Sequence, residues 1–367
     1  MKVLFLTHAL DGGDAATPIL RLATALRNEG IETHVVAPDA GSELAALDGV
    51  GVTRFRRTAG TRARDAVWQA RLRALGFLTT EFTSAVGARR AVEPALIHAH
   101  GWFPSGLVGT WVSGLARLPL LTSLYDADVR LVRHTAVAKP LFRHVVNHSA
   151  ATTTVSRRLA SLVARAAGGP APIVAPLPVE SAPAHADGPR DTARVVVLGA
   201  AGRRGAEAVE RALRAVELLG APVVVEVAAR STAAVPAGAD SQVRWLSSED
   251  RGTTLARVRS AGVLIAAGDV DDADPILLEA QLAGTPLVAT SPDALGHAVQ
   301  HERTGLRASA DEPEAIAAEL RGLRARADRG RSLGEAARMY ALAALAPESS
   351  ARRYAAIYRE LLGAGPA

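Results

Sequence analysis

Short runs of apolar residues alternate with longer stretches of helical periodicity along the first half of the chain. The run KVLFLT at residues 2–7 is largely apolar, which predicts a buried strand. Residues 17–30 predict a helix, since Pro18 suits a first turn, the apolar residues recur on one face and Gly30 ends the pattern. Further strands are predicted at 33–38, 95–100, 118–125 and 151–156, with helices at 104–117 and from Arg157. This alternation predicts a parallel sheet covered by helices on both faces.

The second half of the chain repeats the alternation after a change in composition. Residues 172–191 are rich in Pro, Ala and small polar residues, which indicates a linker between domains. Strands are then predicted at 194–199, 223–228, 242–246, 262–267 and 286–290, and helices at 205–219, around Glu279 and through 312–364. We therefore predict an α/β protein of two doubly wound domains, with a ligand bound across the cleft between them at the carboxyl ends of the strands.

The composition fits this architecture and excludes several functional classes. A chain of 367 residues suits two domains, and the absence of cysteine excludes a disulfide scaffold, a thiolate-bound zinc and a cysteine nucleophile. The N-terminal residues lack the apolar length of a signal peptide, and no stretch has the length of a membrane span. A cytoplasmic location is therefore expected. The net charge of +5 suits an anionic ligand, but no aromatic-basic module predicts nucleic-acid binding.

A glycine pair lies where the first strand is predicted to pass into the first helix. In residues 10–18, Gly12 and Gly13 allow the backbone to approach a ligand, and the following helix N-terminus favours an anion. The alternative is an ordinary strand-to-helix turn, and a glycine pair by itself does not separate the two hypotheses.

The equivalent turn of the second domain, residues 195–209, adds positive charge to its glycines. Gly199, with two further glycines, flanks Arg203 and Arg204 just before the predicted helix. A diphosphate would find both helix N–H groups and guanidinium donors in such a turn. The alternative is a basic, solvated loop.

Five acidic residues cluster within residues 267–280: Asp269, Asp271, Asp272, Asp274 and Glu279. Asp271 and Glu279 stand eight positions apart, so Asp271 is expected in the loop before the helix that carries Glu279. Such carboxylates suit a metal ion, or the hydroxyl groups of a sugar or ribose, from which they accept hydrogen bonds. The aspartates are alternatively a solvated loop that caps the helix. Glu279 lies in an apolar stretch, which a solvated loop does not explain.

Two histidines and two aspartates lie at or just after the ends of the strands predicted in the middle of the first domain. His98 and His100 are two positions apart and so share one face of their strand, but no third ligand is apparent. We therefore expect buried, hydrogen-bonded histidines rather than a metal site. Residues 123–130, SLYDADVR, are predicted to end in an Asp-rich turn, where Asp126 and Asp128 cap a helix or touch a ligand.

Taken in order, these segments resemble the retaining glycosyltransferases of GT-B fold in family 4, over almost the whole chain. LLEAQLAGTPLVAT at residues 277–290 is similar to the family's EAMACGTPVVAT, and HERTGL at 301–306 is similar to its DGETGLLV. The order of the glycine pair, HAHGWFPSG, VSRRL, the linker, the basic loop and the acid-x7-acid motif also matches. The resemblance implies two Rossmann-like domains at 1–178 and 193–345, a linker at 179–192, and a final helix at 346–367 that packs back onto the first domain.

The resemblance assigns roles to residues on the nucleotide side of the site. Glu279 matches the family's glutamate that binds the ribose hydroxyls of the donor, and Asp271 matches the acid near the donor sugar. The basic loop is one residue shorter than the family pattern, so Ala200 stands where Arg is expected, Arg204 matches Lys and Arg203 is left to compensate. The residues implied to bind the donor are thus Gly12, Gly13, Gly199, Arg203, Arg204, Asp271, Leu277, Leu278 and Glu279.

The sugar side departs further from the family pattern. The family has HGSD after the fifth strand, with its histidine on the donor sugar, whereas this chain has YDAD, so Tyr125 takes that place. Residues 271–274, DDAD, replace the family's E-G-F-G, whose glycines offer backbone N–H groups to the sugar. The implied catalytic residues are Arg204, Asp271 and Tyr125, and the implied acceptor-side residues are His8, His100 and Asp126.

The resemblance implies a metal-independent, retaining transfer of a sugar from a GDP- or UDP-linked donor to a small-molecule acceptor, in bacterial natural-product or glycoconjugate biosynthesis. Arg204 and the helix N-termini would stabilise the leaving diphosphate, and no cofactor is expected. One alternative is a non-catalytic GT-B protein, which Tyr125 and Ala200 favour. Another is a nucleotide-sugar epimerase of the same fold, for which no acid/base pair is identified.

A basic stretch, RFRRTAGTRAR at residues 54–64, precedes a predicted amphipathic helix. The apolar residues of that helix are Val67, Leu72, Leu75, Phe82 and Val86. In the family this part of the first domain meets the acceptor. A membrane-surface or phosphorylated acceptor, with peripheral membrane contact, is therefore one hypothesis, and a solvated loop before a core helix is the alternative.

Overall fold

The computed structural model divides the chain into two compact units. The first unit comprises Met1–Val179 and Pro347–Ala367, and the second comprises Glu180–Ala346. The structure describes residues 1–8, 16–39, 49–55, 67–134, 138–178, 190–200, 203–220, 223–229, 243–245, 251–270, 274–291, 295, 299–309 and 311–363. The glycine pair Gly12–Gly13, the acid Asp271 and most of the basic stretch 54–64 lie outside the described residues.

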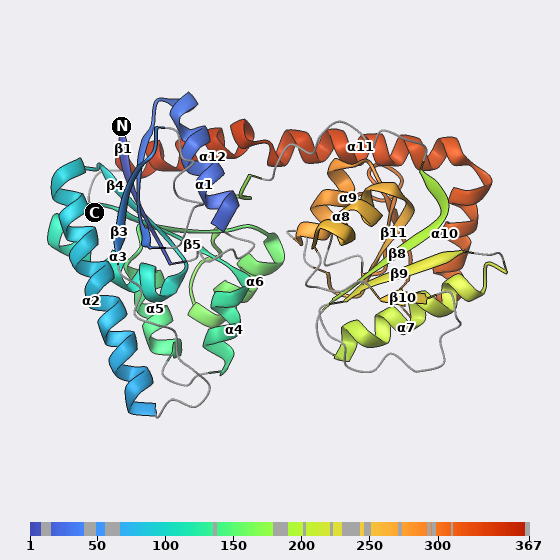
Figure 1. The fold of residues 1–367 in the computed structure, drawn as a ribbon, viewed down its shortest axis with the longest axis horizontal. Coiled ribbons are helices and arrows are strands. Elements are labelled where there is room, and N and C mark those ends of the chain that lie inside the picture. The colour runs from blue at the N-terminus through green and yellow to red at the C-terminus, as the bar shows by residue number, and fades with distance from the viewer. Residues whose placement is uncertain are drawn as a thin grey trace. The chain divides into compact units, whose positions relative to one another are not determined.

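The first unit is built on a parallel, seven-stranded sheet with the order β3-β2-β1-β4-β5-β6-β7 (Figure 1). Its strands are β1 (Lys2–Thr7), β2 (Glu32–Pro38), β3 (Gly51–Phe55), β4 (Leu96–His100), β5 (Leu120–Leu124), β6 (Ala151–Thr154) and β7 (Ile173–Val174). Its helical segments are α1 (Ala16–Ala25), η1 (Leu26–Glu29), α2 (Val67–Val92), η3 (Trp102–Gly106), α3 (Leu107–Ala116), α4 (Asp126–His134), α5 (Ala138–His148), α6 (Arg157–Ala167) and α12 (Pro347–Gly363). The strand order reverses between β1 and β4, which is the switch point where doubly wound sheets bind ligands.

Helices cover both faces of this sheet because its central strands are apolar on both sides. β1 is buried from Val3 to Thr7, and β4 is buried along its whole length. On one face, α1 and α12 pack together over the apolar cluster that includes Phe5 (Figure 1). On the other face, α2 and α3 pack over the cluster that includes Leu4 and Leu6. The two faces therefore alternate along β1, as the pleat of a strand requires.

The second unit repeats the arrangement with a parallel, six-stranded sheet in the order β10-β9-β8-β11-β12-β13. Its strands are β8 (Asp191–Gly199), β9 (Val224–Ala229), β10 (Val243–Trp245), β11 (Ala261–Ala267), β12 (Leu287–Ala289) and β13 (Leu306–Arg307). Its helices are α7 (Arg203–Glu217), α8 (Arg251–Ser260), α9 (Pro275–Leu282), α10 (Pro313–Ala325) and α11 (Ala327–Leu345). One apolar cluster joins α7 and α10 to the sheet, and a second joins α8 and α9 to it. The predicted pair of doubly wound α/β units is confirmed.

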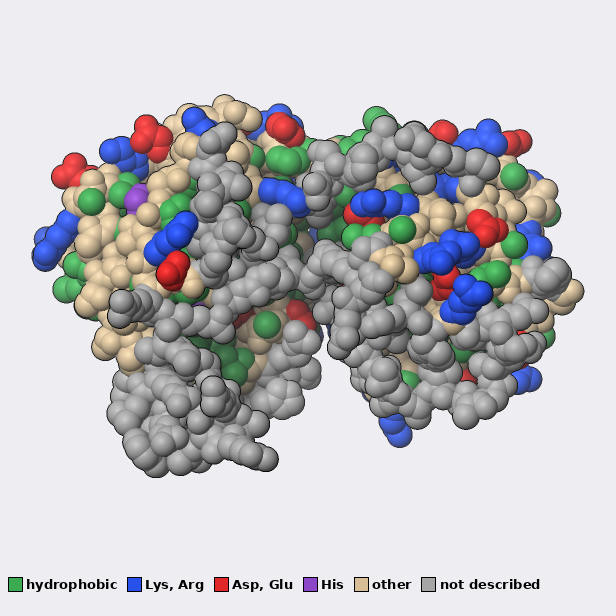
Figure 2. Space-filling model, viewed as in Figure 1, with side chains coloured by type: hydrophobic (Ala, Val, Ile, Leu, Met, Phe, Trp, Pro, Cys, Tyr) green, Lys and Arg blue, Asp and Glu red, His purple; other side chains and the backbone are tan. Residues whose placement is uncertain are grey.

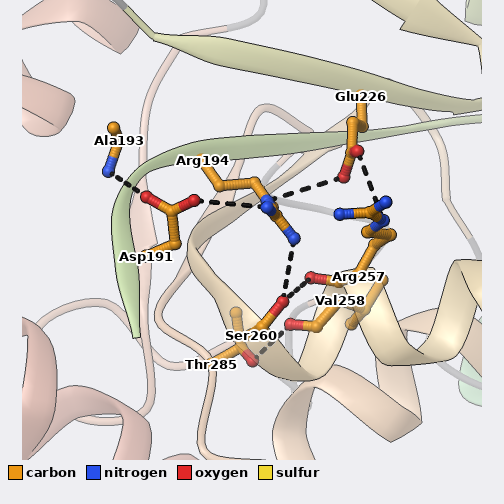
Figure 3. Close-up of polar contacts among 8 residues, drawn as sticks. All are labelled: Asp191, Ala193, Arg194, Glu226, Arg257, Val258, Ser260 and Thr285. Atoms are coloured by element: carbon orange, nitrogen blue, oxygen red, sulfur yellow. Dashed lines mark hydrogen bonds and ion pairs between the residues drawn. The ribbon is translucent and has the colours of Figure 1, made fainter. Parts of the chain in front are cut away.

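A buried ionic network joins strands β8 and β9 to helix α8 (Figure 3). Glu226 is 1% exposed and forms an ion pair with each of two arginines. Its Oε2 lies 3.9 Å from Arg194 Nε, and its Oε1 lies 3.6 Å from Arg257 Nε. Arg194 also donates to Ser260 Oγ at 3.1 Å and pairs with Asp191 at 3.2 Å. The network lies at the amino end of β8, because Asp191 is the first residue of that strand. The network therefore holds the amino ends of the strands together, whereas α7 begins near the carboxyl end of β8.

Several local predictions need correction. Asp126 and Asp128 do not lie in a turn, because α4 begins at Asp126 directly after Tyr125. The segment 172–191 is not wholly linker, since it contains β7 and the first residue of β8. The helical tail 312–364 is interrupted at Arg326 and Ala346, whose backbones leave the helical region. Strand β3 and helix α8 were not predicted, because they show neither a long apolar run nor a strong helical stripe. Helix α5 was also not predicted, although Ala138, Phe142 and Val145 form an apolar stripe at helical spacing.

The surface shows mixed charge on the visible face, where Lys and Arg side chains are interspersed with Asp and Glu (Figure 2). Within the described part of the chain, no helix has the length and apolar character needed to cross a bilayer.

Candidate functional site

In the second unit, the carboxyl ends of β8 and β11 meet the start of helix α7. Gly199 ends β8 and pairs in register with Ala267, which ends β11. Helix α7 approaches this edge so closely that a Cβ atom on Gly205 would lie 1.8 Å from the carbonyl oxygen of Ala200. Only glycine fits there, which is the role of the last glycine in dinucleotide-binding turns. The turn is thus shaped for a close approach of helix and strand backbone.

Arg203 and Arg204 are the first two residues of α7, rather than part of a loop before it. Both side chains are exposed, and the first turn of the helix contains no acidic residue. Arg203 Nε lies 3.4 Å from Glu207 Oε1, one turn further along. A cation at a helix N-terminus interacts unfavourably with the helix macrodipole, by roughly 0.3–1 kcal/mol, so the helix itself gains no stability from this pair.

Helix α9 carries the acid predicted to bind ribose. Asp274 caps the helix, with Oδ1 accepting from Ile276 N at 2.9 Å, and Pro275 follows as its first residue. Glu279 lies one turn further on with 13% of its side chain exposed, and its Oε1 accepts from Arg259 Nε at 2.5 Å. The side chains of Leu277 and Leu278 are buried, at 0% and 9% exposure, so they pack in the core. Glu279 is the charged residue of α9, and its side chain is partly accessible to a ligand.

A second pair of contacts joins the ends of β11 and β12 on the same edge. Gly268 N donates to Thr290 Oγ1 at 2.9 Å, and the glycine has a φ of 75°, which favours a residue without a side chain. Ser291 Oγ lies 2.7 Å from Asp269 Oδ1. Asp269 is thus hydrogen-bonded within this edge, and sequence reasoning did not connect it with Thr290 or Ser291.

In the first unit, three strands bring a histidine or tyrosine to the carboxyl edge of the sheet. His8 follows β1, His100 ends β4 and Tyr125 follows β5. The Tyr125 hydroxyl is hydrogen-bonded to His100 Nδ1 at 2.7 Å, and the two rings are inclined by only 10°. Burial, with a smaller contribution from the charge of His8, lowers the pKa of His100 to about 3. The imidazole of His100 is therefore neutral at physiological pH.

Asp128 is the best-anchored carboxylate of this edge, and it was predicted only as a cap or ligand contact. It is 7% exposed, and its oxygens accept from Tyr125 N at 2.7 Å and from Trp102 N at 3.1 Å. Burial raises the pKa of Asp128 to about 7, although both backbone hydrogen bonds oppose the shift. By contrast Asp126, which was predicted on the acceptor side, is exposed at the start of α4.

Because Gly101 has no side chain, His8 and Asp128 can both lie close to its backbone. Its φ is 87°, and a Cβ atom there would lie 3.0 Å from the His8 ring and 3.4 Å from Asp128 Oδ1. The loop after β4 thus runs between His8 and Asp128, which brings the predicted acceptor-side residues His8 and His100 to one edge. The HAHG motif is evident in the sequence, but the sequence does not predict that Asp128 lies next to it.

His98 has a structural role, as predicted for a buried, hydrogen-bonded histidine. Its Nδ1 is hydrogen-bonded to the Tyr358 hydroxyl and its Nε2 to Ser123 Oγ, both at 2.7 Å. Burial, then the charge of His100, lowers its pKa. Tyr354 Oη donates to Ala175 O at 3.0 Å, so α12 is fastened to the sheet by two buried tyrosines. Among the described residues, no group of three or more His, Asp or Glu side chains is placed to hold a metal ion.

Residues 13–180 match the family described as the glycosyl transferase 4-like domain. The first unit of the chain therefore contains a glycosyl transferase 4-like domain. No curated protein matches it in sequence. Solved structures share its fold across the whole length, with two Rossmann-like units in one chain. The protein therefore combines this domain in its first unit with a second α/β unit, and the two units together have the GT-B fold.

Three solved structures illustrate the likeness of this protein to known folds. HepE of Anabaena, in complex with UDP-glucose, superposes with a TM-score of 0.66 at 15% identity, covering 98% of this chain and 100% of that one. Sucrose-phosphate synthase from Thermosynechococcus elongatus gives a TM-score of 0.69 at 15% identity, with 100% of both chains covered. A putative UDP-N-acetylglucosamine 2-epimerase from Listeria monocytogenes gives 0.55 at 13% identity, covering 98% of this chain and 96% of that one.

Proposed function

We propose that this protein is a glycosyltransferase, which transfers a sugar from a nucleoside-diphosphate sugar, linked to UDP or GDP, to a small-molecule acceptor with retention of configuration and without a metal ion. The observation that carries the proposal is the edge of the second unit, where the cationic start of α7 and the carboxylate of Glu279 both belong to helices that follow central strands. A cation pair suits a diphosphate and a carboxylate suits ribose hydroxyls. HepE, which shares the fold, was solved with UDP-glucose.

Departure of the diphosphate is the costly step in such a transfer. Arg204, exposed at the first turn of α7, and the N–H groups of that turn would stabilise the charge that develops on the phosphate oxygens. The acceptor hydroxyl would attack from the face that the diphosphate leaves. Its proton would pass to the departing phosphate, so that the glycosidic bond forms as the sugar–phosphate bond breaks and the anomeric configuration is retained.

On the first unit, His8, His100 and Tyr125 supply polar groups at the sheet edge for the acceptor or the donor sugar. Because His100 is neutral, it offers hydrogen bonds rather than charge, which suits hydroxyl groups. Tyr125 is neutral as well, since burial raises the pKa of its phenol.

The proposal is tested in two steps with the purified protein. Calorimetry with UDP, GDP and their glucose and mannose derivatives identifies the nucleotide, and Glu279→Ala is expected to weaken that binding by 2–4 kcal/mol, on the order of two charge-assisted hydrogen bonds. NMR of the product from the matching donor and an acceptor panel then reports the anomeric configuration. Nucleotide binding without transfer would favour the non-catalytic alternative, and an epimerised donor formed without acceptor would favour the epimerase.

A further inference from the structure

Among the residues that the structure describes, the carboxylate of Glu279 is held by the guanidinium of Arg259 from the neighbouring helix. Arg259, next to the last residue of α8, donates from Nε to Glu279 Oε1 at 2.5 Å. The Arg259 side chain is 34% exposed and that of Glu279 is 13% exposed, so the pair is only partly open to water. At such a site the interaction is stronger than an exposed salt bridge, because solvent screens it less.

The backbone that carries Arg259 is itself tied down. Arg190 Nη1 donates to the carbonyl of Arg259 at 3.0 Å and to Thr285 Oγ1 at 2.9 Å. Thr285 Oγ1 donates in turn to the carbonyl of Val258 at 2.9 Å. Arg190 also donates to the carbonyl of Ala283, just after α9. These hydrogen bonds hold the end of α8 to the end of α9. The backbone from which the Arg259 side chain extends is therefore fixed in position.

The contact leaves acceptor capacity on the carboxylate. A carboxylate has two oxygens and about four lone-pair directions, and within the described part of the chain one N–H group of Arg259 occupies one of them. The remaining directions suffice for two vicinal hydroxyl groups. Without the guanidinium, the glutamate side chain would have several rotamers open to it, and a ligand would have to select one at an entropic cost.

We propose that Arg259 is a positioning residue for nucleotide binding, which orients the Glu279 carboxylate toward the ribose hydroxyls without touching the nucleotide itself. The proposal rests on the proposed function, in which Glu279 binds ribose. It adds the requirement that ribose affinity depends on a side chain from α8, twenty positions earlier in the chain.

A double-mutant cycle tests the proposal. The affinity of the nucleoside diphosphate that the parent binds is measured by calorimetry for Arg259→Gln, Glu279→Gln and the double variant. We expect Arg259→Gln to weaken binding by about tenfold and to have no effect in the Glu279→Gln background, because the arginine acts through the glutamate. Arg259→Lys is expected to recover part of the loss, since an ammonium group restores the charge but not the fixed geometry.

Arg257→Gln is the matched control, because Arg257 lies on the same helix end but pairs with Glu226. It is expected to lower the melting temperature while leaving nucleotide affinity unchanged. The proposal is overturned if Glu279→Gln weakens binding and Arg259→Gln does not, if Arg259→Gln tightens binding, or if the two losses add. If the parent binds none of the nucleotides, or Glu279→Gln changes nothing, the proposed ribose site fails and this inference fails with it.

Discussion

The hydroxyl of Tyr125 lies 2.7 Å from Nδ1 of His100, and the two rings are inclined by 10°. Burial raises the pKa of the tyrosine and lowers that of the histidine to about 3, so both rings stay neutral around pH 7. The residue that replaces the family's sugar-contacting histidine is therefore part of a preformed, neutral hydrogen-bonded pair. Neutral groups of this kind recognise hydroxyl groups rather than charge, as the proposed contact with a sugar requires.

Tyr125→Phe removes the hydroxyl and leaves His100 Nδ1 without that partner. We expect turnover or nucleotide-sugar affinity to fall by about tenfold, because the variant lacks the hydroxyl that is proposed to donate one hydrogen bond, of about 1–1.5 kcal/mol, to the donor sugar. Affinity for the bare nucleoside diphosphate should not change, because the pair belongs to the first unit. Calorimetry with both ligands makes the comparison. Better donor binding by Tyr125→Ala, with no detectable transfer by the parent, would instead indicate a closed pocket.

Asp128→Asn should destabilise the protein by about 1–3 kcal/mol, because an amide has a single acceptor oxygen for the two backbone N–H groups of Tyr125 and Trp102. The matched control is Asp126→Asn, two positions earlier and exposed at the start of α4. Its expected cost is below about 1 kcal/mol, the contribution of an acid near a helix N-terminus. Urea unfolding measures both. Equal losses in the two variants would contradict the role assigned to Asp128.

Glu81 on α2 is fully buried, and burial raises its pKa to about 7, against a smaller opposing effect of the Ser105 hydroxyl. Between pH 4.5 and 7 the unfolded chain therefore loses a proton that the folded protein keeps, so this group makes folding less favourable as the pH rises.

Glu81→Gln removes that titration. We expect the free energy of unfolding of the variant, relative to the parent, to increase from pH 4.5 to pH 7 and then to level off. Urea unfolding of both proteins at pH 5 and pH 8 measures the difference. A difference that stays constant with pH would show that Glu81 is ionised in the folded protein throughout this range.

Arg204→Ala should lower kcat by about a hundredfold, because its charge matters most when the diphosphate departs. The melting temperature should be unchanged, since the side chain is exposed at the first turn of α7. Arg203→Ala is the comparison, as Arg203 pairs with Glu207 on the same helix. Steady-state kinetics with the identified donor decide between them, and a larger loss in Arg203→Ala would transfer the role to that residue.

The sequence alone determined the elements whose pattern is local. β1 was predicted with its observed bounds, α1 together with η1 was predicted within one residue at each end, and the start of β8 was predicted within three residues. These predictions succeeded because buried parallel strands are continuous apolar runs and the helix is marked by Pro18 and Gly30. The buried, hydrogen-bonded state of His98 and His100 also followed from the sequence, through their spacing on a strand within an apolar environment.

Only the tertiary structure decided which polar groups meet. His98 and Tyr358 are 260 positions apart, Trp102 and Asp128 are 26 apart, and Arg259 and Glu279 are 20 apart. Periodicity reports which face of an element is buried, but it does not report which neighbouring element supplies the partner. That choice depends on strand order and on how closely backbones approach, as at Gly205 and Gly101. The carboxylate Glu279 was therefore found from its apolar surroundings, whereas its guanidinium partner became evident only when α8 and α9 were packed on the same face of the sheet.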